Sequence, residues 1–334
     1  MNNKPFIVAE MSGNHNQSLE RALEIVDAAA NAKVDAIKLQ TYTADTLTIK
    51  GAYTITDKDS LWYGLDLYDL YKEAYTPWEW HNALFDRAKE KGIICFSTPF
   101  DETAVDFLES LDNPIYKIAS FEVNHIPLLK YIAQTSKPVI MSIGASTLAE
   151  IEEAVYTLLE NGCKDLTLLK CTSAYPATPK SANLLTIPHL KYLFDCKVGL
   201  SDHTLGIGVA IASIALGATV IEKHCCLNRA AGGVDSAFSM EPLEMKMLVE
   251  EANLAYLALG KVSYGIMEAE KNSRIFKRSI YASKDIKAGD IFTKENIKVV
   301  RPGNGLHPRY YDKILGTVSK SSIKKGSKII TELI

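Results

Sequence analysis

The sequence lacks any apolar run long enough to cross a membrane and any cysteine pair of the C-x-x-C type. A transmembrane helix needs about 20 consecutive apolar residues, and the longest apolar stretch, 209–221, is shorter and is interrupted by Gly217. The six cysteines match no disulfide, zinc or redox spacing, which favours buried thiols in a reducing compartment. The first residues do not have the pattern of a signal peptide. We therefore expect a cytoplasmic protein with no membrane partner.

Extreme composition is also absent. The chain has 334 residues, of which 47% are hydrophobic and 23% charged, so disorder, collagen and coiled coil are excluded. The net charge of −3 conceals an asymmetry, because residues 276–334 carry a net +8 and the remainder −11. No basic cluster is interleaved with aromatic residues, so we expect no nucleic-acid partner. A small basic module that docks near anionic chemistry on a larger acidic one explains the asymmetry better.

Short apolar runs alternate with amphipathic stretches of helical period along the first 260 residues. Eight strand-then-helix units of this kind predict a (β/α)8 TIM barrel. A doubly wound open sheet is the second choice, since no G-x-G-x-x-G follows the first run. The expected strands are Phe6–Glu10, Ala36–Gln40, Ile93–Ser97, Ile115–Ala119, Val139–Ile143, Leu166–Cys171, Val198–Ser201 and Val220–His224.

Two segments depart from this alternation. Residues 42–77 form a long aromatic insertion, which predicts an ordered lid or binding loop. After about residue 262 the pattern becomes polar and then β-rich. We predict a barrel domain at 1–262, a linker at 263–277 and a small β domain at 278–334. Two similar pieces, 286–291 and 323–329, indicate internal symmetry in the small domain, whose size makes its core marginal.

Polar side chains occur at the end of nearly every predicted strand, where TIM barrels carry their chemistry. A single buried lysine is usually half of an ion pair. Two strand lysines accompanied by several hydroxyls instead indicate a cage for phosphate and carboxylate groups. The candidates are Glu10, Lys38, Gln40, Thr98, Lys117, Ser120, Ser142, Ser173, Tyr175, Ser201, Glu222 and, in a glycine-rich loop, Asp235.

Two histidines, His203 and His224, end neighbouring predicted strands. They could hold a divalent cation with positions left open for substrate and water. From spacing alone, two buried core histidines are an equally good interpretation.

These residues lie in motifs that resemble the sialic acid synthases over essentially the whole chain. Within that family the resemblance is greatest to the pseudaminic acid synthases, because of the Glu10-Met-Ser-Gly turn and the segment 67–81. The motifs are Ala9–Asn16, Lys38–Thr41, Ser97–Phe100, Tyr116–Ser120, Gly199–Thr204, Glu222–His224 and Arg301–Gly305.

The resemblance implies a reaction and its participants. Phosphoenolpyruvate, 2,4-diacetamido-2,4,6-trideoxy-L-altrose and water would give pseudaminic acid and phosphate by C–O cleavage. A divalent metal is implied, manganese above all, with magnesium and cobalt as alternatives. The C-terminal module resembles an antifreeze-like (SAF, β-clip) domain, which in this family reaches across a domain-swapped homodimer and lends an arginine, here Arg301, to the partner.

The family also implies roles for the strand-end residues. His203 and His224 would hold the metal. Glu222 and Glu10 would divide the acid and base work, with Glu222 on the attacking water and Glu10 on the sugar protons as our interpretation; the sequence leaves open which carboxylate takes which role. Asp235 would contact the sugar or a water on the metal. The anion would be held by Lys38, Lys117, Ser120, Ser142 and Ser201.

Other interpretations of the sequence assign a different sugar substrate or a different reaction. Ser173 stands where sialic acid synthases carry asparagine, which disfavours N-acetylneuraminic acid as the product; legionaminic acid is the other choice. A Schiff-base aldolase would need Lys38, Lys117 or Lys170 as a neutral nucleophile. A sugar-binding protein without catalysis is disfavoured by the density of charge at the barrel end.

Overall fold

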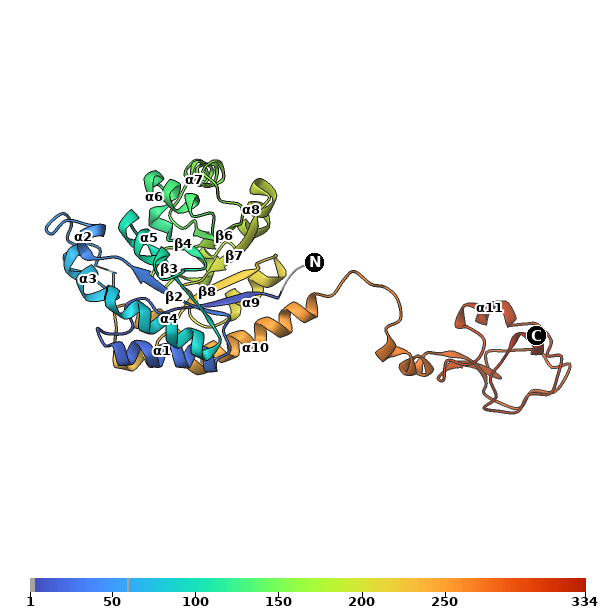
Figure 1. The fold of residues 1–334 in the computed structure, drawn as a ribbon. Coiled ribbons are helices and arrows are strands. Elements are labelled where there is room, and N and C mark those ends of the chain that lie inside the picture. The colour runs from blue at the N-terminus through green and yellow to red at the C-terminus, as the bar shows by residue number, and fades with distance from the viewer. Residues whose placement is uncertain (1–3, 59) are drawn as a thin grey trace. The chain divides into compact units, whose positions relative to one another are not determined.

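The structure, a computed structural model, describes residues 4–58 and 60–334. It divides into a first unit that ends at Gly260 and a second unit, Lys261–Ile334 (Figure 1). In the described part of the chain, no helix is long and apolar enough to cross a bilayer.

Eight parallel strands form a closed barrel in the first unit, in sequence order (Figure 1). Closure is made by β1 against β8, from Phe6 opposite Val220 to Glu10 opposite His224. The TIM-barrel prediction is therefore confirmed, and the open sheet is wrong because such a sheet leaves its edge strands unpaired. The strands are β1 Phe6–Glu10, β2 Ala36–Thr41, β3 Ile94–Pro99, β4 Tyr116–Ile118, β5 Val139–Ser142, β6 Leu166–Cys171, β7 Lys197–Ser201 and β8 Val220–His224.

Ten α-helices belong to the described part of this unit, and their ends follow local chemistry. Thr147 and Glu150 form the capping box that starts α7, and Gly92 ends α4 in the left-handed conformation. The helices are α1 Leu19–Asn31, α2 Ala44–Leu47, α3 Leu67–Ala74, α4 His81–Lys91, α5 Glu102–Glu109, α6 Ile126–Gln134, α7 Leu148–Glu160, α8 Thr186–Phe194, α9 Gly208–Ala215 and α10 Pro242–Leu259.

The inside of the barrel is filled in layers, because alternate residues of a strand point inward. One layer is an apolar cluster of Val8, Ala36, Phe96, Ile140, Leu169 and Val220. Two residues further along each of these strands stand Glu10, Lys38, Thr98, Ser142, Cys171 and Glu222. The apolar layer therefore fills the barrel on the side of the strands' amino ends, and the next layer, toward their carboxyl ends, is polar.

The aromatic insertion is ordered. It contains α2 and α3, and an antiparallel bridge joins Thr54 to Asp66. Gln17, in the turn after β1, donates to the carbonyl oxygens of Glu73 and Tyr75 at 2.9 and 2.7 Å. These contacts attach the insertion to the β1 turn.

The second unit has a small sheet and a core of its own. Strands β9 Ser279–Ala282 and β10 Ile297–Val300 pair antiparallel, and α11 spans Tyr311–Ile314. The two similar pieces noted in the sequence lie against each other through an antiparallel bridge between Ile286 and Ile323. Eight buried apolar residues, among them Phe292, form its core. The segment 263–277, expected to be a linker, carries two short 3-10 turns and is exposed.

The layered packing leaves no room for a side chain at Gly199 on β7. A Cβ there would lie 2.3 Å from the carbonyl oxygen of Val220 and 2.6 Å from a methyl carbon of Leu169. We expect Gly199→Ala to lower the free energy of unfolding by about 1–3 kcal/mol, the usual cost of overpacking. Gly208→Ala is the control, since a Cβ there meets nothing within 4 Å and lies in helix α9. Urea unfolding measures both, and equal stability of the two variants would contradict the packing argument.

Candidate active site

Four charged side chains meet at the carboxyl end of the barrel. Lys38 Nζ lies 2.9 Å from Glu10 Oε2 and 3.5 Å from Glu222 Oε2. Lys117 Nζ lies 3.7 Å from Glu222 Oε1. All four residues are at most 4% exposed. Burial of this kind is costly unless each charge is paired, so the two lysines and two glutamates depend on one another.

Polar side chains from the neighbouring strands complete this cluster. Gln40 donates to Glu10 Oε1 at 2.9 Å, and Lys38 donates to Thr98 Oγ1 at 3.3 Å. On the other side of the barrel, Ser201 donates to Glu222 Oε1 at 2.9 Å. The strand-end residues predicted from β1, β2, β3, β7 and β8 therefore come together through direct contacts.

The pKa values of the two glutamates, Glu10 and Glu222, are shifted in opposite directions. Burial raises the pKa of Glu10, and the nearby charge of Glu222 adds to this, although Lys38 opposes it. Burial alone would also raise the pKa of Glu222, but the charges of Lys117 and Lys38 outweigh it and hold that pKa well below its usual range. Carboxyl groups whose pKa values are driven apart are suited to separate acid and base roles.

Hydroxyl groups gather around Lys117 and Gly144. Lys117 donates to Ser142 Oγ at 2.7 Å, and the backbone N–H of Gly144 donates to Ser120 Oγ at 3.0 Å. A Cβ on Gly144 would lie 2.3 Å from Ser173 Oγ, so only glycine permits this close approach. The lysine and the three serines form a cradle of donors of the kind that holds phosphate or carboxylate oxygens.

The two histidines face each other beside this cluster, with ring centroids 5.2 Å apart. His203 Nδ1 lies 3.0 Å from the carbonyl oxygen of Thr172. A carbonyl only accepts, so Nδ1 carries the proton and Nε2 of a neutral ring keeps its lone pair. His224 Nδ1 is buried without a hydrogen-bond partner and lies 3.6 Å from Asp235 Oδ2. Burial lowers the pKa of His224 well below its usual value.

This donor set can be tested against the metal that the sequence implies. Among residues 4–58 and 60–334, no group of three or more His, Cys, Asp or Glu side chains could hold a metal ion. The two imidazoles alone fit a different arrangement, in which the protein supplies only part of the coordination shell. An unpartnered, buried imidazole nitrogen is the ligand form of histidine. The residues present therefore fit a cation whose remaining positions are left for substrate or water.

The remaining predicted residues lie as follows. Asp235 accepts a hydrogen bond from Ser12, which itself accepts one from Gln40 at 3.2 Å. The ring of Tyr175 packs on His203 at 4.6 Å between centroids. Arg301 is exposed in the second unit, so it is not among the side chains that the barrel unit brings together.

Glu122 is a candidate that the sequence analysis missed. It ends a short 3-10 turn that begins at Ser120, directly after β4. Its Oε2 is shielded from solvent and has no hydrogen-bond partner. Burial raises the pKa of Glu122 to about 7, with Lys117 and Lys38 opposing the shift. Its only signal in the sequence is its place two residues after Ser120, which does not reveal the burial.

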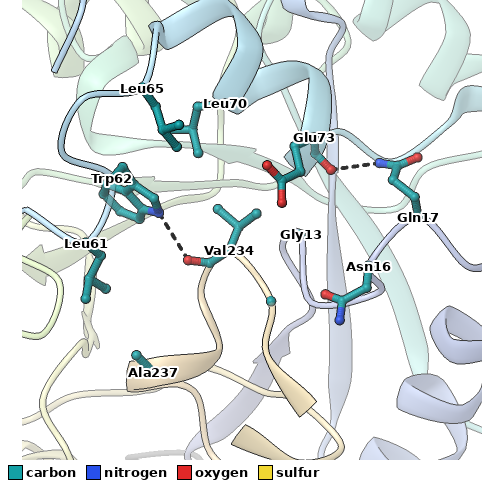
Figure 2. Close-up of a pocket in the computed structure, with 11 residues that line it drawn as sticks. Gly13, Asn16, Gln17, Leu61, Trp62, Leu65, Leu70, Glu73, Val234 and Ala237 are labelled. Atoms are coloured by element: carbon teal, nitrogen blue, oxygen red, sulfur yellow. Dashed lines mark hydrogen bonds between the residues drawn. The ribbon is translucent and has the colours of Figure 1, made fainter. Parts of the chain in front are cut away.

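A groove borders the site on the side of the aromatic insertion (Figure 2). Its volume is about 560 Å³. Trp62 Nε1 donates to the carbonyl oxygen of Val234 at 3.2 Å, and the Trp62 ring packs on Tyr175 at 5.8 Å. Figure 2 shows Val234 pointing toward Leu65 and Leu70, with the carboxylate of Glu73 beside them. The groove thus combines an apolar wall with a polar edge, and Asp235 follows Val234 directly.

Comparison with known proteins gives the family. Residues 25–264 match the model of the NeuB family, and residues 277–330 match that of the SAF domain. The pseudaminic acid synthase of Campylobacter jejuni subsp. jejuni serotype O:23/36 (strain 81-176) is 44% identical over 98% of this chain and 95% of its own. The N,N'-diacetyllegionaminic acid synthase of Campylobacter jejuni serotype O:2 is 37% identical over 98% of this chain and 99% of its own. The crystal structure of an N-acetylneuraminic acid synthetase from Leptospira borgpetersenii serovar Hardjo-bovis has a TM-score of 0.73 at 34% identity, over 81% of this chain and 90% of that one.

The raised pKa of Glu122 predicts a pH-dependent effect on stability. Its carboxyl group has a pKa of about 7 in the folded chain and 4.5 as reference, so the folded state loses stability as pH rises from 4.5 through 7. Glutamine cannot ionise. We therefore expect the stability of Glu122→Gln relative to the parent to improve by on the order of 2–3 kcal/mol between pH 4.5 and 8. Urea unfolding at both pH values tests this, with the exposed Glu152→Gln as control; a constant difference would contradict it.

Proposed function

The chain belongs to the NeuB family and is an enzyme of the transferase class, and from that premise we propose that it is a pseudaminic acid synthase. It would join phosphoenolpyruvate, 2,4-diacetamido-2,4,6-trideoxy-L-altrose and water into pseudaminic acid, with release of phosphate. The observation that carries the chemistry is the buried Lys38–Glu10–Glu222–Lys117 cluster beside two histidines. The full-length similarity to a pseudaminic acid synthase at 44% identity supports the choice of sugar.

Phosphoenolpyruvate would occupy the cradle of lysine and serine donors. Its phosphate and carboxylate are anions, and Lys38 and Lys117 are buried cations whose amines lie in the polar cluster at this end of the barrel. Both lysines also contact Glu222, so binding of the anion would share their charge between two partners. The hydroxyl groups that would add charge-assisted hydrogen bonds belong to Ser120, Ser142, Ser173 and Ser201.

The reaction forms a carbon–carbon bond and breaks a carbon–oxygen bond. The methylene carbon of phosphoenolpyruvate attacks the aldehyde carbon of the sugar, whose oxygen takes up a proton. Water adds to the carbon that bears the phosphate, and the bond between that carbon and the phosphate oxygen breaks. Glu222, held ionised by the two lysines, would orient and deprotonate the water. Glu10, whose pKa is raised, would exchange protons with the sugar.

His203 and His224 would hold a divalent cation, with Asp235 near the second of them. When bound, such a cation polarises a carbonyl oxygen as a Lewis acid. Two imidazoles favour a transition metal over magnesium. Manganese is our proposal, with cobalt and magnesium as alternatives.

The groove beside Trp62 would accept the end of the sugar that carries its methyl and acetamido groups. Its apolar wall suits those methyl groups, and Asn16 and Glu73 offer partners for hydroxyl and amide groups (Figure 2). As the structure describes it, the groove has no lysine or arginine in its lining, so it does not suit a phosphate. The two substrates would thus occupy chemically different parts of one site.

A Schiff-base aldolase is the alternative chemistry. Burial lowers the pKa of Lys117, as such an enzyme would need. Lys38 does not suit this role, because the charges of Glu10 and Glu222 outweigh burial and raise its pKa, which keeps the amine protonated. Lys170 donates to the carbonyl oxygen of Cys171 at 2.6 Å, which occupies its amine.

The proposal is tested by offering phosphoenolpyruvate and Mn²⁺ with three sugars: the altrose above, its legionaminic acid counterpart and N-acetylmannosamine. We expect the altrose to give the highest kcat/KM, with pseudaminic acid identified by mass and NMR. Removal of the metal by chelation should abolish phosphate release, and Mn²⁺ should restore it.

A higher kcat/KM for another sugar would replace the proposed substrate. Full activity after complete chelation would refute the metal assignment. Inactivation by borohydride in the presence of substrate, without phosphate release, would favour the aldolase instead.

Arg301 lies in the SAF-domain unit, in the turn after β10, and is exposed. We propose that a domain-swapped homodimer places it at the partner's barrel. Arg301→Ala should then lower kcat/KM at least about tenfold, the loss of one charge-assisted hydrogen bond, with an unchanged melting temperature. Arg309→Ala, an exposed arginine of the same unit, is the control.

The same variant also tests delivery to the partner. Mixing Arg301→Ala with an inactive Glu10→Gln chain should restore activity, since a mixed dimer pairs one intact barrel with one intact Arg301. Absence of activity after confirmed subunit exchange would show that the unit does not act in trans.

A further inference from the structure

Asp202 and Lys223 form a second buried ion pair that the proposed reaction does not use. Lys223 Nζ lies 2.8 Å from Asp202 Oδ2 and donates to the carbonyl oxygen of Thr204 at 2.6 Å. Asp202 Oδ1 accepts from the backbone N–H of Thr204 at 3.0 Å. The two charged residues are 3% and 1% exposed. Both carboxylate oxygens and the ammonium group are therefore satisfied within the protein.

The pair stands one residue before each of the two proposed metal ligands. Asp202 precedes His203 directly after β7, and Lys223 precedes His224 on β8. The last ladder partners of these strands are Ser201 and Glu222, which hydrogen-bond inside the barrel. By strand alternation, Lys223 projects to the opposite face of β8 from Glu222 and His224, and Asp202 contacts it there.

The pair joins the strands at the point where their ladder ends. Beyond Ser201 and Glu222, the bond from Asp202 N to the carbonyl oxygen of Glu222, at 2.9 Å, is the remaining backbone link between these two segments in the described residues. A shift of one residue would turn the histidines away from each other and from the site. The ion pair opposes such a shift because only the observed register places the two charges in contact.

Stability alone does not account for this pair. A buried ion pair of good geometry is usually no more stabilising than apolar residues of similar size, whereas fixing one register is the best-attested use of buried charge. We propose that Asp202 and Lys223 are positioning residues that hold His203 and His224 at the separation needed to bind the cation. The inference rests on the metal role of these histidines in the proposed function.

The test uses Asp202→Asn/Lys223→Met, which removes both charges together and keeps the side-chain volumes. Titration calorimetry with Mn²⁺ alone, on metal-free full-length protein, measures binding without reference to activity. We expect the dissociation constant to rise by about 10- to 100-fold, the usual effect of losing a group that orients metal ligands, while the melting temperature stays near that of the parent.

The control is Asp165→Asn/Lys197→Met. That exposed pair joins the start of β7 to the residue before β6, with Nζ and Oδ2 at 2.8 Å, and its loss should leave Mn²⁺ affinity unchanged. Should the first double variant fail to fold, Asp202→Glu is the second test, because it lengthens one side chain of the pair and keeps both charges. We then expect weaker Mn²⁺ binding with the melting temperature retained.

The outcomes separate this inference from the proposed function. If the parent binds Mn²⁺, His203→Ala does not, and a folded variant of the pair binds as the parent does, only the positioning role is refuted. If the parent itself binds no Mn²⁺, the metal assignment fails and this inference fails with it.

Discussion

β1 pairs with β8 over five residues, from Phe6 opposite Val220 to Glu10 opposite His224, and this pairing closes the barrel. Closure forces alternate residues of all eight strands inward, in layers. An apolar layer around Phe96 fills the interior below. The polar side chains two residues further along these strands also point inward, so they contact one another in the next layer. The candidate site is a direct consequence of that geometry.

The buried charges follow from this crowding, and removing them from water costs the fold free energy. Lys38 contacts carboxylates from both β1 and β8, and Lys117 contacts Glu222 from across the barrel. Ionic clusters of this kind rarely add stability relative to apolar packing. Conflicts between local composition and good packing are typical of functional sites. In exchange, two chemically identical glutamates acquire pKa values shifted in opposite directions.

The aromatic insertion belongs to the barrel unit, whereas the second unit folds around a core of its own. The insertion is held by Gln17 and by the bond from Trp62 to Val234, so it forms one wall of the groove next to the charged cluster. The second unit, Lys261–Ile334, has its own apolar core around Phe292 and carries Arg301 on an exposed turn.

The strands, their order around the barrel and the face of most candidate-site residues can be predicted from local sequence pattern. Apolar runs mark the strands, and a period of two places Lys38 and Gln40 on one side of β2. The capping box of Thr147 and Glu150 is equally predictable, because capping depends on residues only three apart. Which charges meet depends instead on contacts that form on folding. Lys38 and Glu222 come from strands that are not neighbours, the burial of Glu122 depends on the packing around a short turn, and the Asp202–Lys223 pair depends on the register of β7 with β8. Such contacts join residues far apart in the chain, and local pattern carries no information about the distance between them.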